Sequence, residues 1–425
     1  MYLSKAQGAR RRSISKDAMQ LKRLRELLNT AAQDEPVKRA PPRGVCAVLR
    51  DKLCLTILLL CVPLGYWVKL QGLADHWVFT LNFIGIIPLA WLIGKSTEDL
   101  AAVTGEVMGG LLNATFGNVV EMLLCVASIK SGQLTITKCT LLGSILSNLL
   151  LVMGCSCLFG GIWGLNWQDV APTQRFTESG ANAQIVMLLL AVVCIGLPTA
   201  YADTMEDVDG DFSSAVLAMS RHLSILLLVA YFLYLYFQIV SHPDLFGESD
   251  EEGDADMGPR TAVAVLATCT VACAVSTEYL IGSLQGTLDT WKLSKEFVGI
   301  ILLPIIGNAA EHYTAITVAL VDKMDLAIGV AVGSSCQMAL LVAPFTVIVG
   351  WAEDKDMNLD FHSFQFFVLI GAVLVVASVL WSRQVHWLYG AMMIIAYFAI
   401  AIVYFNETPQ VSVFHDRPSQ HHHHR

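Results

Sequence analysis

The chain has 425 residues, of which 55% are hydrophobic and only 15% are charged. Soluble domains usually carry about 25% charged residues, so the composition excludes a disordered chain, a nucleic-acid-binding protein and most soluble enzymes. The net charge of −9 also argues against a general affinity for phosphate backbones. The mean hydropathy of +0.58 indicates a polytopic membrane protein. The 11 cysteines lie mostly inside apolar runs without paired spacing, so we expect buried free thiols.

The first 52 residues differ from the rest because they hold 13 Lys or Arg. No short apolar region with a small-residue cleavage site follows them, so they do not form a cleavable secretory signal. An excess of positive charge marks the cytosolic side of a membrane protein. We therefore expect residues 1–52 to form a basic cytosolic tail.

A transmembrane helix needs about 20 mostly apolar residues. Eleven segments of the chain meet this requirement: 53–70, 76–95, 105–129, 134–160, 180–202, 214–240, 260–283, 296–321, 325–350, 362–382 and 386–405. The third and eighth carry Asn and Glu in mid-span, which sets them apart from the others.

The two halves of the chain repeat each other. Three short motifs recur in the same order: Ser-Thr-Glu at 96–98 and 276–278, Gly-Asn-x-x-Glu at 117–121 and 307–311, and Gly-Ser at 143–144 and 333–334. The last two recur 190 residues later and the first 180 residues later, so one ten-residue insertion separates them. Each copy holds five spans, and an odd number inverts the second copy. Inverted repeats are typical of secondary transporters, with the substrate site at the repeat interface near the membrane midplane.

The sequence thus predicts an all-α polytopic membrane protein with 11 transmembrane helices arranged as one plus five plus five. Its expected parts are an extra first helix (53–75), a first repeat (76–240), an acidic cytosolic linker (241–259), a second repeat (260–405) and a C-terminal tail (406–425). The linker holds a run of acidic residues that is either a solvated loop or a regulatory, cation-attracting element: Glu248, Asp250, Glu251, Glu252, Asp254 and Asp256. Four consecutive histidines near the C-terminus could bind a metal or could equally be a remnant of cloning, so they carry no functional prediction.

Glu121 and Glu311 are expected to form the centre of the site. Each lies well inside an apolar span, where a lone carboxylate costs at least about 2.5–3.5 kcal/mol. Because neither has an obvious Lys or Arg partner, each must be protonated, paired or bound to a cation. Two such carboxylates that meet at the interface of an inverted repeat would form a site for a hard cation.

The neighbouring residues supply further oxygen ligands. Asn118 and Asn308 lie one helical turn before the glutamates and add amide oxygens, unless they only link helices. Gly117 and Gly307 permit a close helix approach or a local break. Pro304 frees backbone carbonyls in its span. Such an oxygen-only set suits Ca²⁺, which takes about 6–8 oxygen ligands.

Protons and a divalent cation would compete for the same carboxylate oxygens, so loading one would release the other. Further titrating groups could carry additional protons, although the first two could equally be interfacial and the third a packing residue: Glu98, Glu278 and His312. Another set of polar residues is expected to line the pathway or to pack between helices: Asn113, Ser144, Ser147, Ser334 and Gln337.

The glutamate motifs resemble the two signature repeats of the calcium/proton exchanger family, within the Ca²⁺/cation antiporter superfamily. The resemblance covers roughly residues 50–405 and is carried by four stretches: Gly110–Glu121, Gly143–Asn148, Gly299–His312 and Met324–Gln337. It implies eleven helices, arranged as one plus five plus five, and transport of Ca²⁺ out of the cytosol against protons.

The same resemblance implies roles for individual residues. It assigns cation binding to Glu121 and Glu311, and proton exchange or gating to Glu98 and Glu278. It also implies that the acidic segment 248–256 acts in Ca²⁺ access or regulation.

We therefore expect an antiporter that exchanges cytosolic Ca²⁺ for protons of an acidic lumen. Its partners would be Ca²⁺, H⁺ and the lipid bilayer, with no cofactor and no nucleic acid. It would be a multi-pass protein of a vacuolar or other acidic-organelle membrane, with its N-terminus in the cytosol. An enzyme is not expected, since HExxH is absent. A Na⁺-driven Ca²⁺ exchanger and a passive divalent-cation channel are the alternatives, and the sequence leaves stoichiometry, divalent selectivity and oligomeric state open.

Overall fold

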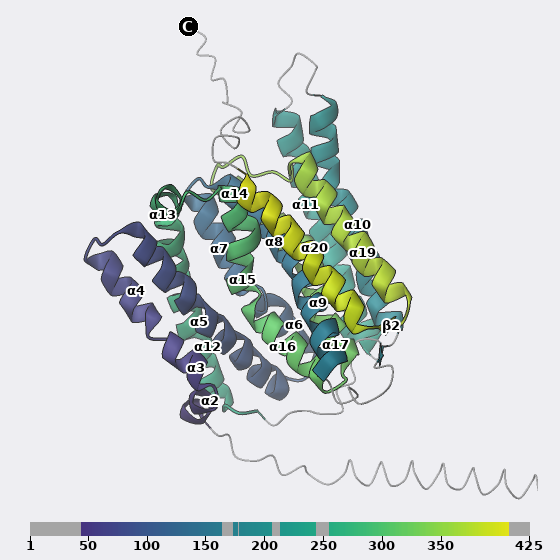
Figure 1. The fold of residues 1–425 in the computed structure, drawn as a ribbon, viewed down its shortest axis with the longest axis horizontal. Helices are drawn as coiled ribbons and strands as arrows, with labels where there is room; N and C mark the ends of the chain where they lie inside the picture. Colours follow the sequence, from purple (N-terminus) through teal and green to yellow (C-terminus); the bar gives the residue numbers. More distant parts are fainter. Residues whose placement is uncertain (1–43, 164–172, 177, 206–212, 244–254, 408–425) are drawn as a thin grey trace, which may run out of the picture. The chain divides into compact units, whose positions relative to one another are not determined.

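The computed structural model describes residues 44–163, 173–176, 178–205, 213–243 and 255–407. This part of the chain is almost entirely helical, and Figure 1 shows its helices gathered side by side. Several predicted features lie outside the described residues: the tail up to residue 43, the residues from 408 onward, and Glu248, Asp250, Glu251, Glu252 and Asp254.

The first half of the chain begins with three short helices and continues with longer ones. Its elements are α2 (Val45–Asp51), α3 (Leu53–Leu58), α4 (Cys61–Leu70), α5 (Asp75–Thr104), α6 (Glu106–Phe116), α7 (Val119–Lys130), α8 (Leu134–Leu146), the π-helical η1 (Ser147–Val152), α9 (Met153–Trp163), the strand β1 (Gln174–Arg175), α10 (Glu178–Thr204), α11 (Ser213–Tyr236) and η2 (Phe237–Ser241). The end of the predicted basic tail is therefore helical in α2.

The second half repeats this succession of long, short and π-helical elements. They are α12 (Pro259–Gly282), α13 (Leu284–Trp291), α14 (Lys295–Phe297), η4 (Val298–Leu302), α15 (Leu303–Gly307), α16 (Ala309–Leu320), α17 (Met324–Gln337), η5 (Met338–Val342), α18 (Ala343–Ala352), α19 (Ser363–Trp381), the strand β2 (Gln384–Val385) and α20 (Trp387–Asn406). Strands β1 and β2 pair antiparallel, so they join two loops that are far apart in the sequence.

The predicted transmembrane character is confirmed for the described residues. Ten helices are long and apolar enough to cross a membrane, and one bent pair raises the number to as many as eleven. The second span is longer than predicted, because α5 continues past residue 95 to Thr104. The polar run at 95–99 suggested a helix end, but Ser96, Thr97 and Asp99 are buried against the protein and the helix continues through them.

Two spans are broken near their middle, at the places where Gly117 and Gly307 permitted either a close helix approach or a local break. Gly117 and Asn118 separate α6 from α7, and the pair around Asn308 bends by 59°. Asn118 (φ −108°, ψ 18°) and Asn308 (φ −88°, ψ 14°) leave the helical region in the same way. The breaks lie 190 residues apart, which agrees with the sequence repeat, whereas the one-plus-five-plus-five arrangement and its inversion stay predictions.

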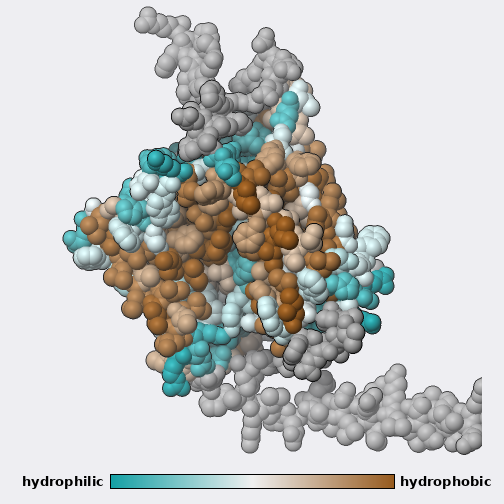
Figure 2. All heavy atoms as spheres, in the orientation of Figure 1, coloured by the Kyte–Doolittle hydropathy of each residue, from teal (hydrophilic) through white to brown (hydrophobic). Residues whose placement is uncertain are grey.

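Large apolar side chains cover the outside of the described bundle. Leu70, Phe367 and Trp381 are 77%, 71% and 85% exposed. In Figure 2 apolar residues fill the middle of the visible face, and hydrophilic residues gather toward its upper and lower ends. Because exposed apolar surface of this extent is rare on soluble monomers, this face is suited to the lipid core of a bilayer.

Helices of the two halves approach each other closely where α8 meets η4 and α15. A Cβ atom added to Gly143 would lie 2.3 Å from the Ile300 carbonyl oxygen and 2.6 Å from Pro304 Cγ. Both neighbours are rigid, since one is backbone and the other belongs to a ring. Only glycine therefore fits at this contact.

We expect Gly143→Ala to destabilise the fold by about 1–3 kcal/mol, because overpacking displaces the neighbouring backbone. The melting temperature of the detergent-solubilised protein measures this effect. Gly371→Ala in α19 is the matched control, since its Cβ would meet no atom within 4 Å. The interpretation would be wrong if the two variants had the same melting temperature.

Candidate cation site

Glu121 and Glu311 each lie in the first turn of a short helix that starts at a break. Each is the third residue of its helix, α7 for Glu121 and α16 for Glu311. From the sequence, both were expected well inside apolar spans. The first turn of a helix has free backbone N–H groups and the positive end of the helix dipole, both of which favour a carboxylate.

The two carboxylates lie close enough to interact electrostatically. Glu121 is 1% exposed, and a Cβ atom at Gly307 would lie 2.8 Å from its Oε1 atom. The glutamate of the first motif therefore packs against the glycine of the second. The meeting of the two motifs, which the sequence predicted from their repetition, is present in the structure.

One oxygen of each carboxylate is buried and unsatisfied. Within the described residues, Oε2 of Glu121 and Oε2 of Glu311 have no hydrogen-bond partner. Buried polar atoms are nearly always hydrogen-bonded, so each exception needs a proton or another ligand. An unsatisfied oxygen pair of this kind fits a bound cation or two protonated carboxyl groups.

Asn118 and Asn308 connect the two halves through their amides. The Nδ2 atom of Asn118 donates to Oε1 of Gln337, and Nδ2 of Asn308 donates to the backbone oxygen of Ser144 at 3.1 Å. Both asparagines are almost fully buried. The break in each half is thus hydrogen-bonded to a helix of the other half, α17 for Asn118 and α8 for Asn308. The asparagines therefore link helices, whether or not they also bind a cation.

The predicted pathway residues fall into two groups. Ser144 and Ser147 are fully buried in α8 and η1, and Ser334 and Gln337 are half-buried in α17. The Ser144 hydroxyl has no partner among the described residues. Asn113 instead lies exposed on α6. At the break, only its backbone oxygen takes part, by accepting a hydrogen bond from the Gly117 N–H at 2.9 Å.

The candidate proton-exchange residues occupy different surroundings. Glu98 in α5 and Glu278 in α12 are both exposed, whereas the Ser-Thr pair before each of them is fully buried. Glu98 lies six residues before the end of its helix, so it is farther from the helix end than the sequence suggested. His312 follows Glu311 in α16 and is half-buried.

Two residues at this place were not among the predicted site residues. The Glu121 carboxylate interacts electrostatically with the thiols of Cys125 and Cys273, which are both fully buried. Cys125 follows Glu121 by one helical turn, which the sequence could have indicated, whereas Cys273 comes from α12. In η1, the buried Asn148 has an Oδ1 atom with no hydrogen-bond partner among the described residues. The sequence signal for Asn148 was the polar pair Ser147 and Asn148 inside an apolar run.

The side chains at this place offer few metal ligands. Among the described residues, no three His, Cys, Asp or Glu side chains come together in a way that could hold a metal ion. A cation between Glu121 and Glu311 would therefore complete its coordination with amide, hydroxyl and backbone oxygens. Such ligands suit hard divalent cations such as Ca²⁺.

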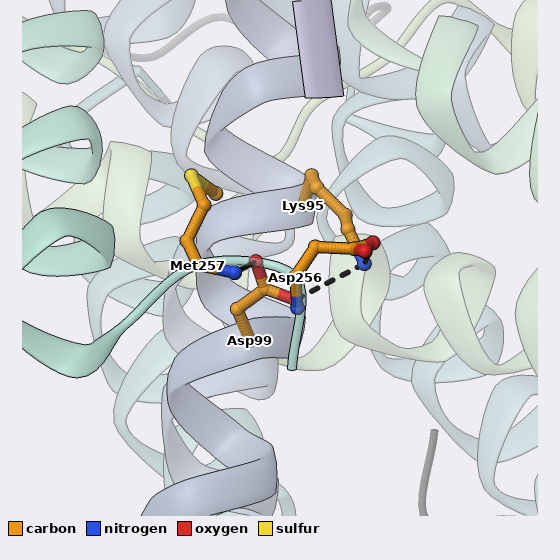
Figure 3. A network of polar contacts seen from close by, with 4 residues as sticks. All are labelled: Lys95, Asp99, Asp256 and Met257. Carbon is orange, nitrogen blue, oxygen red and sulfur yellow. Dashed lines mark hydrogen bonds and ion pairs between the residues drawn. The ribbon is translucent and has the colours of Figure 1, made fainter. Parts of the chain in front are cut away.

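One member of the acidic run, Asp256, lies within the described residues and is held in place. It forms an ion pair with Lys95 of α5, with 3.0 Å between Nζ and Oδ2. Figure 3 shows this pair beside Asp99 and Met257. Asp256 is therefore neither a freely solvated residue nor an unpaired carboxylate available to attract cations.

Comparison with known proteins shows which family the chain belongs to. A family model described as sodium/calcium exchanger protein matches residues 75–240 and 261–406. The chain belongs to the sodium/calcium exchanger protein family. Vacuolar cation/proton exchanger 1b of Oryza sativa subsp. japonica is 39% identical to it over 383 residues, which are 85% of this chain and 83% of that protein.

Two further relatives of this sodium/calcium exchanger family member extend the comparison. The Ca(2+)/H(+) antiporter of Aphanothece halophytica is 37% identical over 371 residues, covering 82% of this chain and 95% of that protein. The solved structure of native YfkE has 31% identity and a TM-score of 0.70, covering 83% of this chain and 99% of YfkE. The resemblance to calcium/proton exchangers is confirmed, and with it the assignment to membrane antiporters.

Proposed function

We propose that this member of the sodium/calcium exchanger family is a Ca²⁺/H⁺ antiporter of an acidic-organelle membrane, such as the vacuole. The observation that carries the proposal is the pair Glu121 and Glu311, which meet across the two motifs with one unsatisfied oxygen each. The relatives named as vacuolar cation/proton exchangers and as a Ca(2+)/H(+) antiporter support the same ions and compartment.

The carboxylate pair provides the coupling between the two ions. When both carboxylates are ionised they attract a divalent cation, and when both are protonated they are neutral and no longer do so. Asn118, Asn308 and Ser144 lie around them and supply further oxygens. Proton loading from one side therefore releases the cation, and deprotonation on the other side restores the site for the next one.

The energetics set a minimum number of protons. A Ca²⁺ gradient of about 10⁴-fold opposes transport by about 5.5 kcal/mol. One proton that moves down about two pH units supplies about 2.7 kcal/mol, so one is insufficient and two approximately balance the gradient. The two glutamates could carry two protons, and Glu98, Glu278 and His312 remain candidates for a third.

The resemblance to calcium/proton exchangers implies the direction of transport, in which Ca²⁺ leaves the cytosol and enters the lumen. The basic tail is proposed to lie in the cytosol. The connection between α10 and α11 would then face the lumen. It carries acidic residues but no Lys or Arg at 203–211.

Purified protein in acid-loaded proteoliposomes is expected to take up Ca²⁺ without any Na⁺, and a protonophore should abolish this uptake. A Na⁺-driven exchanger would instead require a Na⁺ gradient. A passive channel would equilibrate Ca²⁺ and would produce no alkalinisation of the lumen coupled to uptake. Uptake that is indifferent to the pH gradient would rule the proposal out, and empty liposomes are the control.

A further inference from the structure

A buried carboxylate lies at the start of the helix that leads to the second break. Glu296 of α14 is 8% exposed, and its Oε2 atom has no hydrogen-bond partner within the described residues. The helix continues from α14 through η4 and α15 to Gly307, so Glu296 lies roughly 16 Å from the break at 1.5 Å per residue. The coupling described for the central glutamate pair does not use this third buried carboxylate.

Glu296 adjoins a polar cluster formed with α8 and α20. The Cys139 thiol of α8 interacts electrostatically with Glu296 and with Glu407, the residue after α20. The Tyr404 hydroxyl of α20 interacts with the same two carboxylates and has no hydrogen-bond partner among the described residues. Ser294, which caps α14, donates to the Tyr404 backbone oxygen at 3.2 Å and so fixes the two helices beside each other.

The positive charges near this cluster do not pair with Glu296. The Lys138 ammonium of α8 donates to Oδ1 of Asn358 at 2.6 Å and to the backbone oxygen of Asp360 at 2.7 Å. Lys295 is half-buried, and neither lysine forms an ion pair with Glu296 in the described part of the chain. The same part holds no His, Cys, Asp or Glu group that could bind a metal ion. The ligand that suits this buried carboxylate is therefore a proton.

Further buried hydroxyls continue from the cluster toward the central pair. Tyr397 lies two turns before Tyr404 on the same face of α20, and its hydroxyl adjoins that of Ser147 in η1. Ser144 lies three residues before Ser147, and its backbone oxygen accepts from Asn308 at the second break. None of the four hydroxyls has a hydrogen-bond partner among the described residues. Internal water commonly satisfies buried polar groups of this kind.

These side chains lie on helices that pack against one another. α14 packs against α8 and α20, α8 packs against η4, and α20 packs against η1 (Figure 1). A Cβ atom at Gly299 would lie 2.5 Å from the Cβ atom of Cys139, so α8 and η4 are in close contact beside the cluster. A row of unsatisfied hydroxyls, called here the hydroxyl row, therefore runs between Glu296 and the second break: Tyr404, Tyr397, Ser147 and Ser144.

Glu296 also belongs to the sequence repeat. It precedes Glu311 by 15 residues, and Glu106 precedes Glu121 by the same number. Glu106 is the first residue of α6, so each broken span begins with a glutamate in its first turn. A recurring acid at this place is expected if it acts in transport, since the repeat also preserves the central glutamates.

We propose that Glu296 is a proton-relay residue that takes protons from water at the end of the bundle where α14 begins and passes them along the hydroxyl row to Glu311. Internal water molecules between the hydroxyls complete the path. Each hydroxyl or water accepts one proton and donates another, so Glu311 gains the proton that Glu296 loses and the groups between them are unchanged. In the proposed orientation this end faces the lumen, and the relay rests on the proposed function.

Two kinds of Ca²⁺ flux in proteoliposomes test the relay. Uptake into acid-loaded vesicles needs proton movement, whereas exchange of radioactive for unlabelled Ca²⁺ at equal pH needs none. We expect Glu296→Gln to slow pH-driven uptake at least about tenfold, because it removes a proton-transfer group, and to leave Ca²⁺ exchange as in the wild type. Unchanged uptake would overturn the relay, and so would an equal loss of both fluxes, which indicates a structural role.

Further variants show whether the titrating group and the hydroxyl row carry the effect. Glu296→Asp keeps a carboxyl group and should keep most of the uptake, and an Asp variant as slow as Glu296→Gln would count against the relay. Tyr404→Phe and Tyr397→Phe remove only the hydroxyls and should slow uptake several-fold without slowing Ca²⁺ exchange. Tyr236→Phe, on the exposed face of α11, is the control. If Glu296→Gln does not fold, the tyrosine variants decide, and uptake equal to that of the control would refute the path.

A hydration measurement is independent of the transported ion. Hydroxyl radicals made by X-ray radiolysis of the solubilised protein oxidise side chains beside internal water, and mass spectrometry identifies the oxidised sites. We expect Tyr397 and Tyr404 to be oxidised several-fold faster than Tyr231, which is about equally buried but donates its hydroxyl to the Ala114 backbone oxygen at 3.4 Å. Equal oxidation would show that the hydroxyl row is dry and would refute the relay. If the wild type moves no Ca²⁺, the proposed function fails, while the oxidation rates still decide whether the water path exists.

Discussion

Uptake of Ca²⁺ driven by a pH gradient is expected to fall about 100-fold when Glu121 or Glu311 is replaced by Gln. Gln keeps the size and one oxygen of Glu but loses its charge and its ability to exchange a proton. A charge-assisted contact contributes about 1.5–3 kcal/mol, and about 2.7 kcal/mol corresponds to two pH units or a factor of 100. The measurement is uptake of radioactive calcium into acid-loaded proteoliposomes.

A stability measurement shows whether these variants lose transport for the proposed reason. Each removes a carboxylate with an unsatisfied buried oxygen, so the melting temperature should stay the same or rise. Glu353→Gln is the control, because Glu353 is 43% exposed and forms only a surface ion pair. Full uptake by both glutamate variants would show that the site lies elsewhere.

Gly307→Ala is expected to reduce the same uptake at least about tenfold. The added Cβ would lie 2.8 Å from Oε1 and 3.2 Å from Cδ of Glu121, so the carboxylate must move away. A displacement of about 1 Å within a site can cost a factor of 100 in rate. The effect should be larger for Gly307→Val, because its two further methyl groups occupy more of the same space.

Gly329→Ala provides the control for this substitution, since a Cβ there meets no atom within 4 Å. Alanine also has the higher helix propensity, so this control should be neutral or slightly stabilising. The half-saturating Ca²⁺ concentration should rise in Gly307→Ala and stay unchanged in Gly329→Ala. Equal uptake by the two variants would contradict the packing of Gly307 against the cation site.

The transmembrane segments could be predicted because hydropathy acts locally. A run of about 20 apolar residues is stable in a bilayer whichever neighbours it meets. The predicted boundary at residue 95 was wrong because polar residues in a row suggest a helix end. Asp99 instead has backbone N–H partners on a distant segment, and no local pattern announces such partners.

The helix breaks were only partly foreseeable. Gly117 and Gly307 signalled that a break was permitted, yet glycine also occurs inside continuous helices. The breaks depend on Asn118 and Asn308, whose amides bond to Gln337 and to the Ser144 backbone in the opposite half. These partners lie 219 and 164 residues away along the chain, so only the folded arrangement brings them together.

The sequence by itself determined the membrane class and the repeat, and it singled out the two glutamates as candidates, because apolar runs, recurring motifs and buried charges are visible residue by residue. The tertiary structure decided which groups meet: Glu121 with Gly307, Glu121 with Glu311, and Asp256 with Lys95. These meetings have a physical reason that no local pattern contains. A buried charge or amide needs a partner at hydrogen-bond distance, and only packing of helices distant in the chain supplies one.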